Sequence, residues 1–295
     1  MTSSRFWFRN KKKSQEEKAM SKFKDKILMC PPDFFTVDYV INPWMAGHEE
    51  SMSLEKAKQQ WQELSDTVAE YAEIVTIEPD PKLPDMVFTA NAGVVYGNKA
   101  IASHFMPMER RAEEPIFKQW FRDNGFDLFE LDEKIGFEGA GDCLLDRRGP
   151  WLWTGYGFRT EIEAHADIQK FFDIELVSIR LTDERFYHID TCFCPLTDGF
   201  LMYHPPAFDY ESRIAIESRI PPHKRIIVDT FDAGNFACNA INIDDRVFLH
   251  RASDPLKARL MLAGFKVHEV ELTEFLKAGG SAKCLSLKLN EPVRD

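Results

Sequence analysis

The chain has 295 residues, of which 44% are hydrophobic and 13% aromatic, enough for one large core or two smaller domains. Its formal net charge of −11 argues against nucleic acid or an anionic membrane as the main partner and suits a small cationic ligand. No run of about 18 apolar residues occurs, so we expect no membrane-spanning helix.

The N-terminal residues 1–22 are basic and lack a long apolar segment, which predicts a flexible extension rather than a secretory signal. No Gly/Ser-rich or Pro-rich linker divides residues 23–295, so we predict a single domain there. The six cysteines are scattered without a C-x-x-C pair. This pattern argues against a disulfide framework or a structural zinc site and favours reduced thiols in the cytoplasm.

Helix signals recur five times along the chain. They are an apolar stripe of Leu54, Trp61, Leu64, Val68, Tyr71 and Val75; residues 111–124, ending at Gly125; a capping-box pattern at 160–163 with a helix to Phe172; residues 209–219; and Asp254-Pro255 with a helix to Gly264.

Short β-rich runs surround these helices. One run follows each helix, at residues 74–77, 126–131, 174–179, 225–228 and 265–270. Hairpin patterns precede four of the helices, at residues 89–103, 141–154, 190–203 and 238–249, and single strands are expected at 284–289 and 26–30. The predicted unit is therefore strand, strand, helix, strand.

The first strand of each unit carries a polar residue. Asn91, Glu138, His188, Asn235 and Cys284 are separated by 47, 50, 47 and 49 residues. A regular period of this length indicates an array of one supersecondary unit, and five such units can close in a ring. Equivalent positions would then point at the ring axis, so we predict that these five residues converge on one central pocket.

Three of the five residues are suited to nucleophilic catalysis. Cys284 follows two glycines, at 279 and 280, that allow close approach of the backbone, and a thiolate there could act as a nucleophile. His188 could donate a proton to a leaving amine and then activate water. Glu138 could either orient the imidazole or pair with a guanidinium. Lys283 could lower the pKa of Cys284, although alternation along a strand would point it away.

Other polar residues are weaker candidates. Asp190 would share a strand face with His188 and could hold a cation, and Arg110 and Arg159 are candidates for binding a carboxylate or are surface arginines. Asp85 and Asn91 fit either a site or a turn and a hairpin. No P-loop, G-x-G-x-x-G or H-E-x-x-H motif occurs, so we expect neither a cofactor nor a metal.

Five short motifs resemble one known group of proteins. They are residues 88–93 (Phe-Thr-Ala-Asn-Ala-Gly), 137–142 (Phe-Glu-Gly-Ala-Gly-Asp), 187–191 (Tyr-His-Ile-Asp-Thr), 279–284 (Gly-Gly-Ser-Ala-Lys-Cys) and 42–45 (Asn-Pro-Trp-Met). The first four, in this order, resemble the guanidino-group-modifying, or pentein, superfamily, from about residue 24 to the end. Within it the chain is most similar to the arginine dihydrolases, which residues 42–45 and 89–93 resemble, and it is also similar to dimethylarginine dimethylaminohydrolases and arginine deiminases.

The resemblance implies a five-bladed α/β-propeller of ββαβ units around a central pocket. It implies that Cys284, His188 and Glu138 are catalytic. It also implies a substrate site lined by Asn42, Asp85, Asn91, Arg110, Arg159 and Asp190.

The implied activity is hydrolysis of free L-arginine through a covalent Cys-amidino intermediate, giving ornithine, carbon dioxide and ammonia. The resemblance leaves open a deiminase or dimethylarginine dimethylaminohydrolase that stops at citrulline, and an amidinotransferase. A ribosome-binding anti-association factor resembles this fold without being an enzyme, but the retained Cys, His and Glu argue against that role. Related enzymes are often oligomers, so a homo-oligomer is also implied.

Overall fold

The computed structural model describes residues 25–49 and 51–293, and they form five three-stranded sheets. The sheets, in order of their strands, are β15 (Leu287–Lys288), β1 (Asp25–Met29) and β2 (Ala72–Thr76); β3 (Gly93–Tyr96), β4 (Lys99–Ala102) and β5 (Asp127–Phe129); β6 (Cys143–Leu145), β7 (Trp151–Tyr156) and β8 (Glu175–Arg180); β9 (Phe193–Leu196), β10 (Phe200–Tyr203) and β11 (Arg225–Ile227); and β12 (Ile241–Ile243), β13 (Arg246–Leu249) and β14 (Lys266–Glu269).

All five sheets have the same topology. The first strand pairs antiparallel with the second, and the second pairs parallel with the third. Parallel neighbours need a crossover, and in each unit one helix supplies it. These helices are α2 (Leu54–Ala69), α3 (Glu114–Asp123), α4 (Ala164–Phe172), α5 (Tyr210–Arg219) and α7 (Asp254–Leu262). The predicted ββαβ unit and the pentein fold are therefore confirmed.

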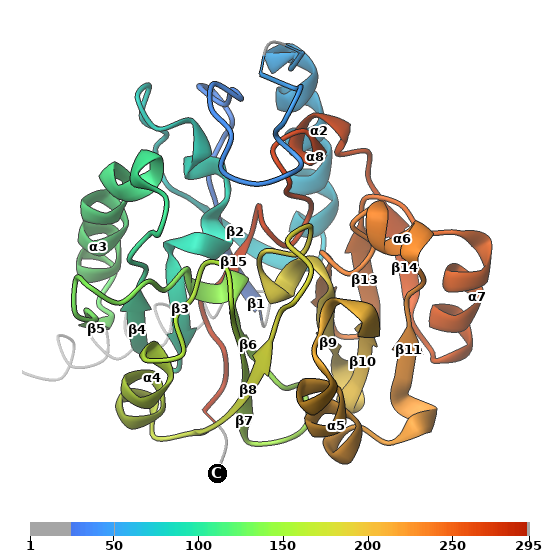
Figure 1. Ribbon diagram of the computed structural model, residues 1–295. Coiled ribbons are helices and arrows are strands. Elements are labelled where there is room, and N and C mark those ends of the chain that lie inside the picture. Colours follow the sequence, from blue (N-terminus) through green and yellow to red (C-terminus); the bar gives the residue numbers. More distant parts are fainter. Residues whose placement is uncertain (1–24, 50, 294–295) are drawn as a thin grey trace, which may run out of the picture.

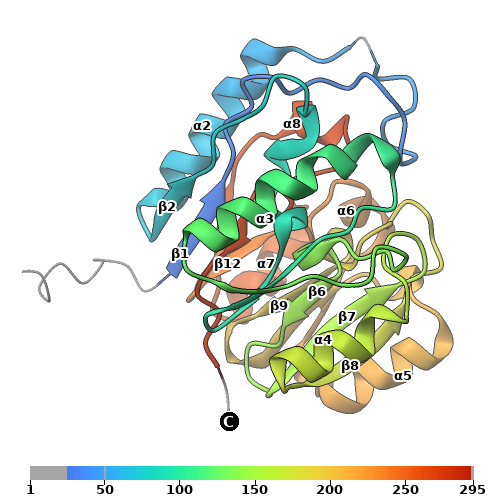
Figure 2. The same cartoon turned by 90° about the vertical axis from the view of Figure 1, so that its left-hand side faces the viewer.

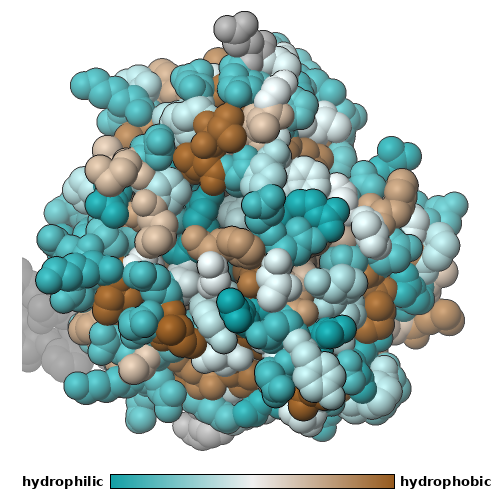
Figure 3. Space-filling model, in the orientation of Figure 1, coloured by the Kyte–Doolittle hydropathy of each residue, from teal (hydrophilic) through white to brown (hydrophobic). Residues whose placement is uncertain are grey.

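The helices lie at the periphery and the strands lie toward the middle of the molecule (Figures 1 and 2). Helix α2 shows why, because its buried face is formed by Trp61, Leu64 and Val68 at helical spacing. Its first turn is capped by Ser53, whose side chain accepts a hydrogen bond from the backbone N–H of Lys56. Hydrophilic residues predominate on the face shown in Figure 3, with small hydrophobic groups between them.

Two further short helices lie in the connections between sheets, one between β11 and β12 and one between β14 and β15. They are α6 (Thr230–Gly234) and α8 (Thr273–Leu276). No described helix is long and apolar enough to cross a membrane. The prediction for residues 1–22 lies outside the described residues, and the single domain over 23–295 stays a prediction.

Several local predictions were wrong. Tyr71 lies in a turn and Val75 lies in β2, so neither is on the stripe of helix α2, because the helix ends at Ala69. Helix α4 begins at Ala164 without a side-chain cap, since Thr160 instead accepts a hydrogen bond from the N–H of Glu138. Helix α7 is capped by Ser253, one residue before the expected Asp254.

The polar residues of the repeat do not lie in strands. Asn91 lies in the 3₁₀ turn η2 (Thr89–Ala92), and Glu138 and His188 precede the turns η4 (Gly139–Gly141) and η5 (Ile189–Thr191). These turns come just before β3, β6 and β9. The side chains therefore leave the backbone at the inner end of each blade, where the blades meet.

Hydrogen bonds between these inner ends close the ring. They join neighbouring repeats in succession: the Ala90 N–H to the Cys284 carbonyl at 3.1 Å, Asn91 Nδ2 to the Glu138 carbonyl at 3.3 Å, His188 Nε2 to Glu138 Oε2 at 2.8 Å, Asn239 Nδ2 to the Asp190 carbonyl at 3.1 Å, and Asn239 Nδ2 to Cys284 Sγ at 3.1 Å. The series visits all five repeats and returns to the first, so distant parts of the sequence share one centre.

At Gly139, the blade that contains β6 approaches the blade that contains β3 closely. Its φ is +59°, and a Cβ there would lie 2.7 Å from the carbonyl oxygen of Gly93. We expect Gly139→Ala to lower the free energy of unfolding by about 1–3 kcal/mol, measured by urea denaturation. Gly234→Ala is the matched control, because nothing lies within 4 Å of its added Cβ. Equal stability of the two variants would contradict the close approach.

Candidate active site

The imidazole of His188 is held by Glu138. Both residues are buried and both precede a 3₁₀ turn, and His188 Nε2 lies 2.8 Å from Glu138 Oε2. The other ring nitrogen, Nδ1, has no hydrogen-bond partner among the described residues. A Cβ on Gly141 would lie 3.0 Å from this nitrogen, so glycine lets the blades approach the ring. The pair therefore presents an imidazole that is fixed on one side only.

The carboxylate of Glu138 contacts other groups besides His188. Its Oε2 also accepts a hydrogen bond from Arg159 at 3.0 Å, and its Oε1 accepts one from the N–H of Met106 at 3.3 Å. Burial by itself would raise the pKa of Glu138, but the charge of Arg159 and the hydrogen bond and charge of His188 outweigh it and lower the pKa to about 2. The carboxylate is thus ionised at every physiological pH.

Cys284 is positioned by the side chain of Asn239. Asn239 Oδ1 accepts hydrogen bonds from the backbone N–H groups of Ser281 and Cys284, at 3.1 and 3.0 Å, and its Nδ2 donates to Cys284 Sγ at 3.1 Å. The thiol itself donates to Asp190 Oδ2 at 3.5 Å. Burial and the charge of Asp190 raise the pKa of the Cys284 thiol well above its ordinary value. The resting site therefore favours the thiol, and a cation beside it would favour the thiolate.

Three buried carboxylates each keep one oxygen without a hydrogen-bond partner among the described residues. One is Asp142, whose Oδ2 lies 4.0 Å from His188 Nε2. The two others, which are not this close to the imidazole, are Asp85, whose other oxygen accepts a hydrogen bond from Tyr39 at 2.8 Å, and Asp190, whose other oxygen contacts Cys284. Burial raises the pKa of these two, that of Asp190 to about 6. Buried polar atoms without partners are rare in proteins, and they require an explanation. A cationic ligand with several N–H donors would satisfy Asp85 and Asp190.

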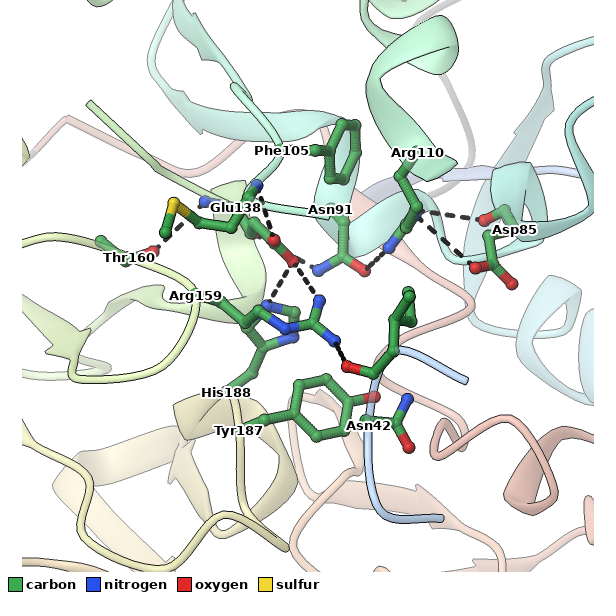
Figure 4. Close-up of polar contacts among 12 residues, drawn as sticks. Asn42, Asp85, Asn91, Phe105, Arg110, Glu138, Arg159, Thr160, Tyr187 and His188 are labelled. Atoms are coloured by element: carbon green, nitrogen blue, oxygen red, sulfur yellow. Dashed lines mark hydrogen bonds and ion pairs between the residues drawn. The ribbon is translucent and has the colours of Figure 1, made fainter. Parts of the chain in front are cut away.

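Two guanidinium groups point into the same region (Figure 4). Arg110 makes a bidentate contact with Glu113, at 2.9 and 2.7 Å, and donates to Asn91 Oδ1 at 2.8 Å. Arg159 lies over the ring of Tyr187, with 4.7 Å between the guanidinium carbon and the ring centroid. Each side chain is thereby held in one orientation, with its charge inside the protein.

Asn42 and Tyr187 hold the glycine segment that precedes Cys284. Asn42 donates to the carbonyl of Ala278 at 3.0 Å, and the hydroxyl of Tyr187 donates to the carbonyl of Gly279 at 2.7 Å. Gly279 has a φ of +80°, and a Cβ there would lie 2.8 Å from Asn42 Oδ1. Only glycine fits this contact without strain.

Comparison with known proteins places this geometry in a family. Residues 36–290 match the family model described as N,N dimethylarginine dimethylhydrolase, eukaryotic. The chain belongs to this family. Over 268 residues it is 57% identical to the bifunctional arginine dihydrolase/ornithine cyclodeaminase ArgZ of Synechocystis sp., and over 270 residues it is 54% identical to the bifunctional enzyme AgrE of Nostoc sp.. These matches cover 91% and 92% of this chain but 38% of each relative, so the chain spans well under half the length of those relatives.

A third relative matches along most of its own length. The N(G),N(G)-dimethylarginine dimethylaminohydrolase of Mycobacterium tuberculosis is 37% identical over 90% of this chain and 86% of that protein. The family is a branch of the pentein superfamily.

Solved structures agree with this assignment. The N-terminal domain of ArgZ, solved as a cysteine variant bound to substrate, superposes with a TM-score of 0.91, is 56% identical, and covers 92% of this chain and 100% of that one. A dimethylarginine dimethylaminohydrolase carrying an S-methyl-L-thiocitrulline adduct is 19% identical, covers 89% of this chain and 98% of that one, and has a TM-score of 0.76. At that identity the likeness shows the shared fold alone.

Of the five residues that the repeat pattern selected, four meet at the ring centre. Asn91, Glu138, His188 and Cys284 lie there, whereas Asn235 is half-buried at the C-terminal end of helix α6, which it caps, and donates to the carbonyl of Phe231. The prediction for Asn235 was wrong, and Asn239 occupies the place instead. A signal was present, because Asn239-Ala240 directly precedes β12 as Asn91-Ala92 precedes β3.

The six residues predicted to line a substrate site also lie around this centre. Asn42, Asp85, Asn91, Arg110, Arg159 and Asp190 are all buried there. Asp142 was not predicted, yet its Oδ2 lies 4.0 Å from His188 Nε2, and its Oδ1 accepts a hydrogen bond from the N–H of Ile189. Within the described part of the chain, no group of three or more His, Cys, Asp or Glu side chains is arranged to hold a metal ion.

The pKa of Glu138 links the site to acid stability. Its ordinary value of 4.5 falls to about 2 in the folded protein, so its stabilising effect is complete above pH 4.5 and is lost as the pH falls toward 2. Measured by urea unfolding, we expect this to remove on the order of 3 kcal/mol from the wild type between these pH values. Glu138→Gln will lack this component, whereas Glu163→Gln, which alters an exposed side chain, will follow the wild type. Parallel curves for all three proteins would refute the link.

Proposed function

We propose that this chain is a cysteine-dependent arginine dihydrolase, which converts free L-arginine to ornithine, carbon dioxide and ammonia. The observation that carries the proposal is the buried thiol of Cys284 beside Asp190, whose second oxygen, like one oxygen of Asp85, has no partner among the described residues. A guanidinium offers the N–H donors and the positive charge that these carboxylates lack. The similarity to ArgZ and AgrE supports arginine as its source.

The reaction begins when the guanidinium binds between the carboxylates. Its charge offsets that of Asp190 and favours ionisation of the Cys284 thiol, which passes its proton to His188, and the thiolate then attacks the guanidinium carbon. His188, oriented by Glu138, donates a proton to the departing ammonia, and a covalent thiouronium remains. His188 then activates water, which releases citrulline and the free thiol.

Two arginines are available for the α-carboxylate of the substrate. Arg159 uses one of its five donors on Glu138 and one on the carbonyl of Ile41, so others remain for a ligand. Arg110 is more fully committed, to Glu113, Asn91 and the carbonyl of Asp85. Arg159 is therefore the stronger candidate for direct contact, and Arg110 fixes Asn91.

A dihydrolase must repeat the cycle on citrulline, which is neutral. We assign the holding of citrulline to Asn91, because an amide can both donate to and accept from a ureido group. Its Oδ1 already accepts from Arg110 and its Nδ2 donates to the Glu138 carbonyl, which fixes the orientation of the amide. One N–H and one oxygen lone pair remain for a substrate.

The family model favours a second candidate reaction. Its description names dimethylarginine hydrolysis, which would give citrulline and dimethylamine and would stop after one round. An arginine deiminase would also stop at citrulline, and an amidinotransferase would need an acceptor amine. The proposed reaction needs no cofactor or metal. All six cysteines are unpaired, and we place the protein in the cytoplasm, where thiols stay reduced. A homo-oligomer is also part of the proposal, and light scattering would test it.

The first test is product analysis. Purified protein incubated with L-arginine should give ornithine and about two ammonia per arginine, and Cys284→Ser should abolish both. Cys143→Ser is the control, because its hydroxyl can bond with Thr154, which already lies 3.7 Å from the Cys143 sulfur. Citrulline as the final product would assign the chain to the deiminases, and dimethylamine from dimethylarginine would select the second candidate. Activity in Cys284→Ser would disprove the nucleophile.

The second test concerns Asn91. Asn91→Ser shortens the side chain and removes its amide, so we expect citrulline to accumulate. Hydrolysis of citrulline should fall at least about tenfold more than hydrolysis of arginine, equivalent to about 1.4 kcal/mol. The comparison is Asn235→Ser, at the residue that follows helix α6, which should behave like the wild type. Equal loss of both steps in Asn91→Ser would show that Asn91 has no special role in the second round.

A further inference from the structure

Lys283 extends into the protein from the residue next to the nucleophile. Its segment is a turn and not a strand, with a hydrogen bond from the N–H of Leu285 to the carbonyl of Ser281 and one from the N–H of Ser286 to the carbonyl of Lys283. The ammonium group donates to the carbonyl of Ser286 at 3.2 Å. The residue is half-buried, and it lines a cavity that is partly open to solvent.

This cavity has a volume of about 60 Å³, and its wall is largely apolar. Five charged residues also line it: Asp25, Arg147, Lys283, Lys288 and Glu291. A cavity of this size with such polar groups can hold water, which lets an ammonium group stay charged in the interior.

Lys283 is the cation of this cavity that lacks an ion-pair partner among the described residues. Arg147 is paired with Glu291 at 2.6 Å, and Lys288 is paired with Asp25 at 3.1 Å. Burial lowers the pKa of Lys283, while the charges of Asp190 and of the Cys284 thiolate act against this. Glu291, which lines the same cavity, acts in the same direction as Asp190 and Cys284 but is itself paired with Arg147, so the charge of Lys283 is balanced in part by the catalytic site.

Several groups around Cys284 oppose or favour ionisation of its thiol. Burial and Asp190 oppose its ionisation, and the Ser281 backbone, Asn239 and Lys283 favour it. Of these last three, Lys283 alone carries a formal charge. The titratable groups that face Cys284, directly or through Asp190 and Lys283, are Asp190, Tyr187, Lys283, His188, Asp142, Glu291 and Arg147.

The two rounds of the proposed reaction differ in whether the substrate itself brings a positive charge to the Cys284 thiol. Arginine brings a positive charge to the thiol, whereas citrulline brings none. We propose that Lys283 supplies, from the cavity side of the site, the positive charge that keeps Cys284 ionised when the bound substrate is neutral. This inference rests on the proposed function, in which Cys284 is the nucleophile. Lys283 is therefore a positioning residue that acts through Cys284, and its positive charge matters most in the second round.

The test removes the charge and keeps the length of the side chain. Lys283→Met should raise the pH midpoint for inactivation by iodoacetamide by about one unit, equivalent to a tenfold lower rate at lower pH. It should slow citrulline hydrolysis about tenfold more than arginine hydrolysis, and the loss should recover as the pH rises. Lys283→Arg should keep the wild-type profile. Lys288→Met, which removes another cation from the same cavity, should also keep it.

The outcomes separate this inference from the proposed function. If iodoacetamide does not inactivate the enzyme, or Cys284→Ser remains active, the nucleophile is wrong and the role of Lys283 falls with it. If Cys284 is the nucleophile but Lys283→Met slows both rounds equally at every pH, with an unchanged inactivation profile, Lys283 is merely structural and the inference is overturned. If arginine gives only citrulline, the second round cannot be compared with the first. The pH profile of inactivation by iodoacetamide then still tests whether Lys283 promotes ionisation of the Cys284 thiol. Lys283→Gln provides a second neutral variant should Lys283→Met not fold.

Discussion

The carboxylate of Glu138 is fully buried, and the centre of the molecule depends on it. One of its oxygens contacts both His188, at 2.8 Å, and Arg159, at 3.0 Å. A buried carboxylate is stable only when such partners outweigh the loss of hydration, and here they do so by a wide margin. Because the two partners come from different blades, the same contact fixes the imidazole and holds the ring together.

At Asp85 and Asp190, by contrast, the partners do not offset the loss of hydration. Asp85 and Asp190 are buried, yet one oxygen of each lacks a partner among the described residues. Their pKa values are raised by burial, so the free site holds negative charge at a cost in free energy. A guanidinium would relieve that cost and would also favour the thiolate of Cys284. Binding and activation of the nucleophile are thereby linked through the same carboxylate, Asp190.

In the proposed dihydrolase reaction, this linkage would assist the first round and not the second. The cationic substrate supplies the charge that the thiolate needs, and the neutral product does not. In the turn after Gly279, the thiol of Cys284 contacts Asn239 whereas Lys283 lines the cavity, and the role proposed for Lys283 is to act on that thiol from the cavity side. A strand in this segment would not have produced that arrangement.

The sequence by itself determined the repeat. The helix stripes, the β-rich runs and the period near 48 residues identified five ββαβ units, and the order of Asn91, Glu138, His188 and Cys284 indicated a shared centre. These features could be read because they depend on local periodicity and on spacing along the chain. The structure brings all nine predicted site residues to that centre.

Only the tertiary structure decided which atoms meet. Asn239 rather than Asn235 contacts the thiol, Arg159 rather than Arg110 pairs with Glu138, and Lys283 lines a cavity. The reason is that the site residues leave from 3₁₀ turns and short loops, where one residue more or less rotates a side chain to a different direction. Strand alternation does not apply there, and the contacts form between segments that are 21 to 50 residues apart in the sequence.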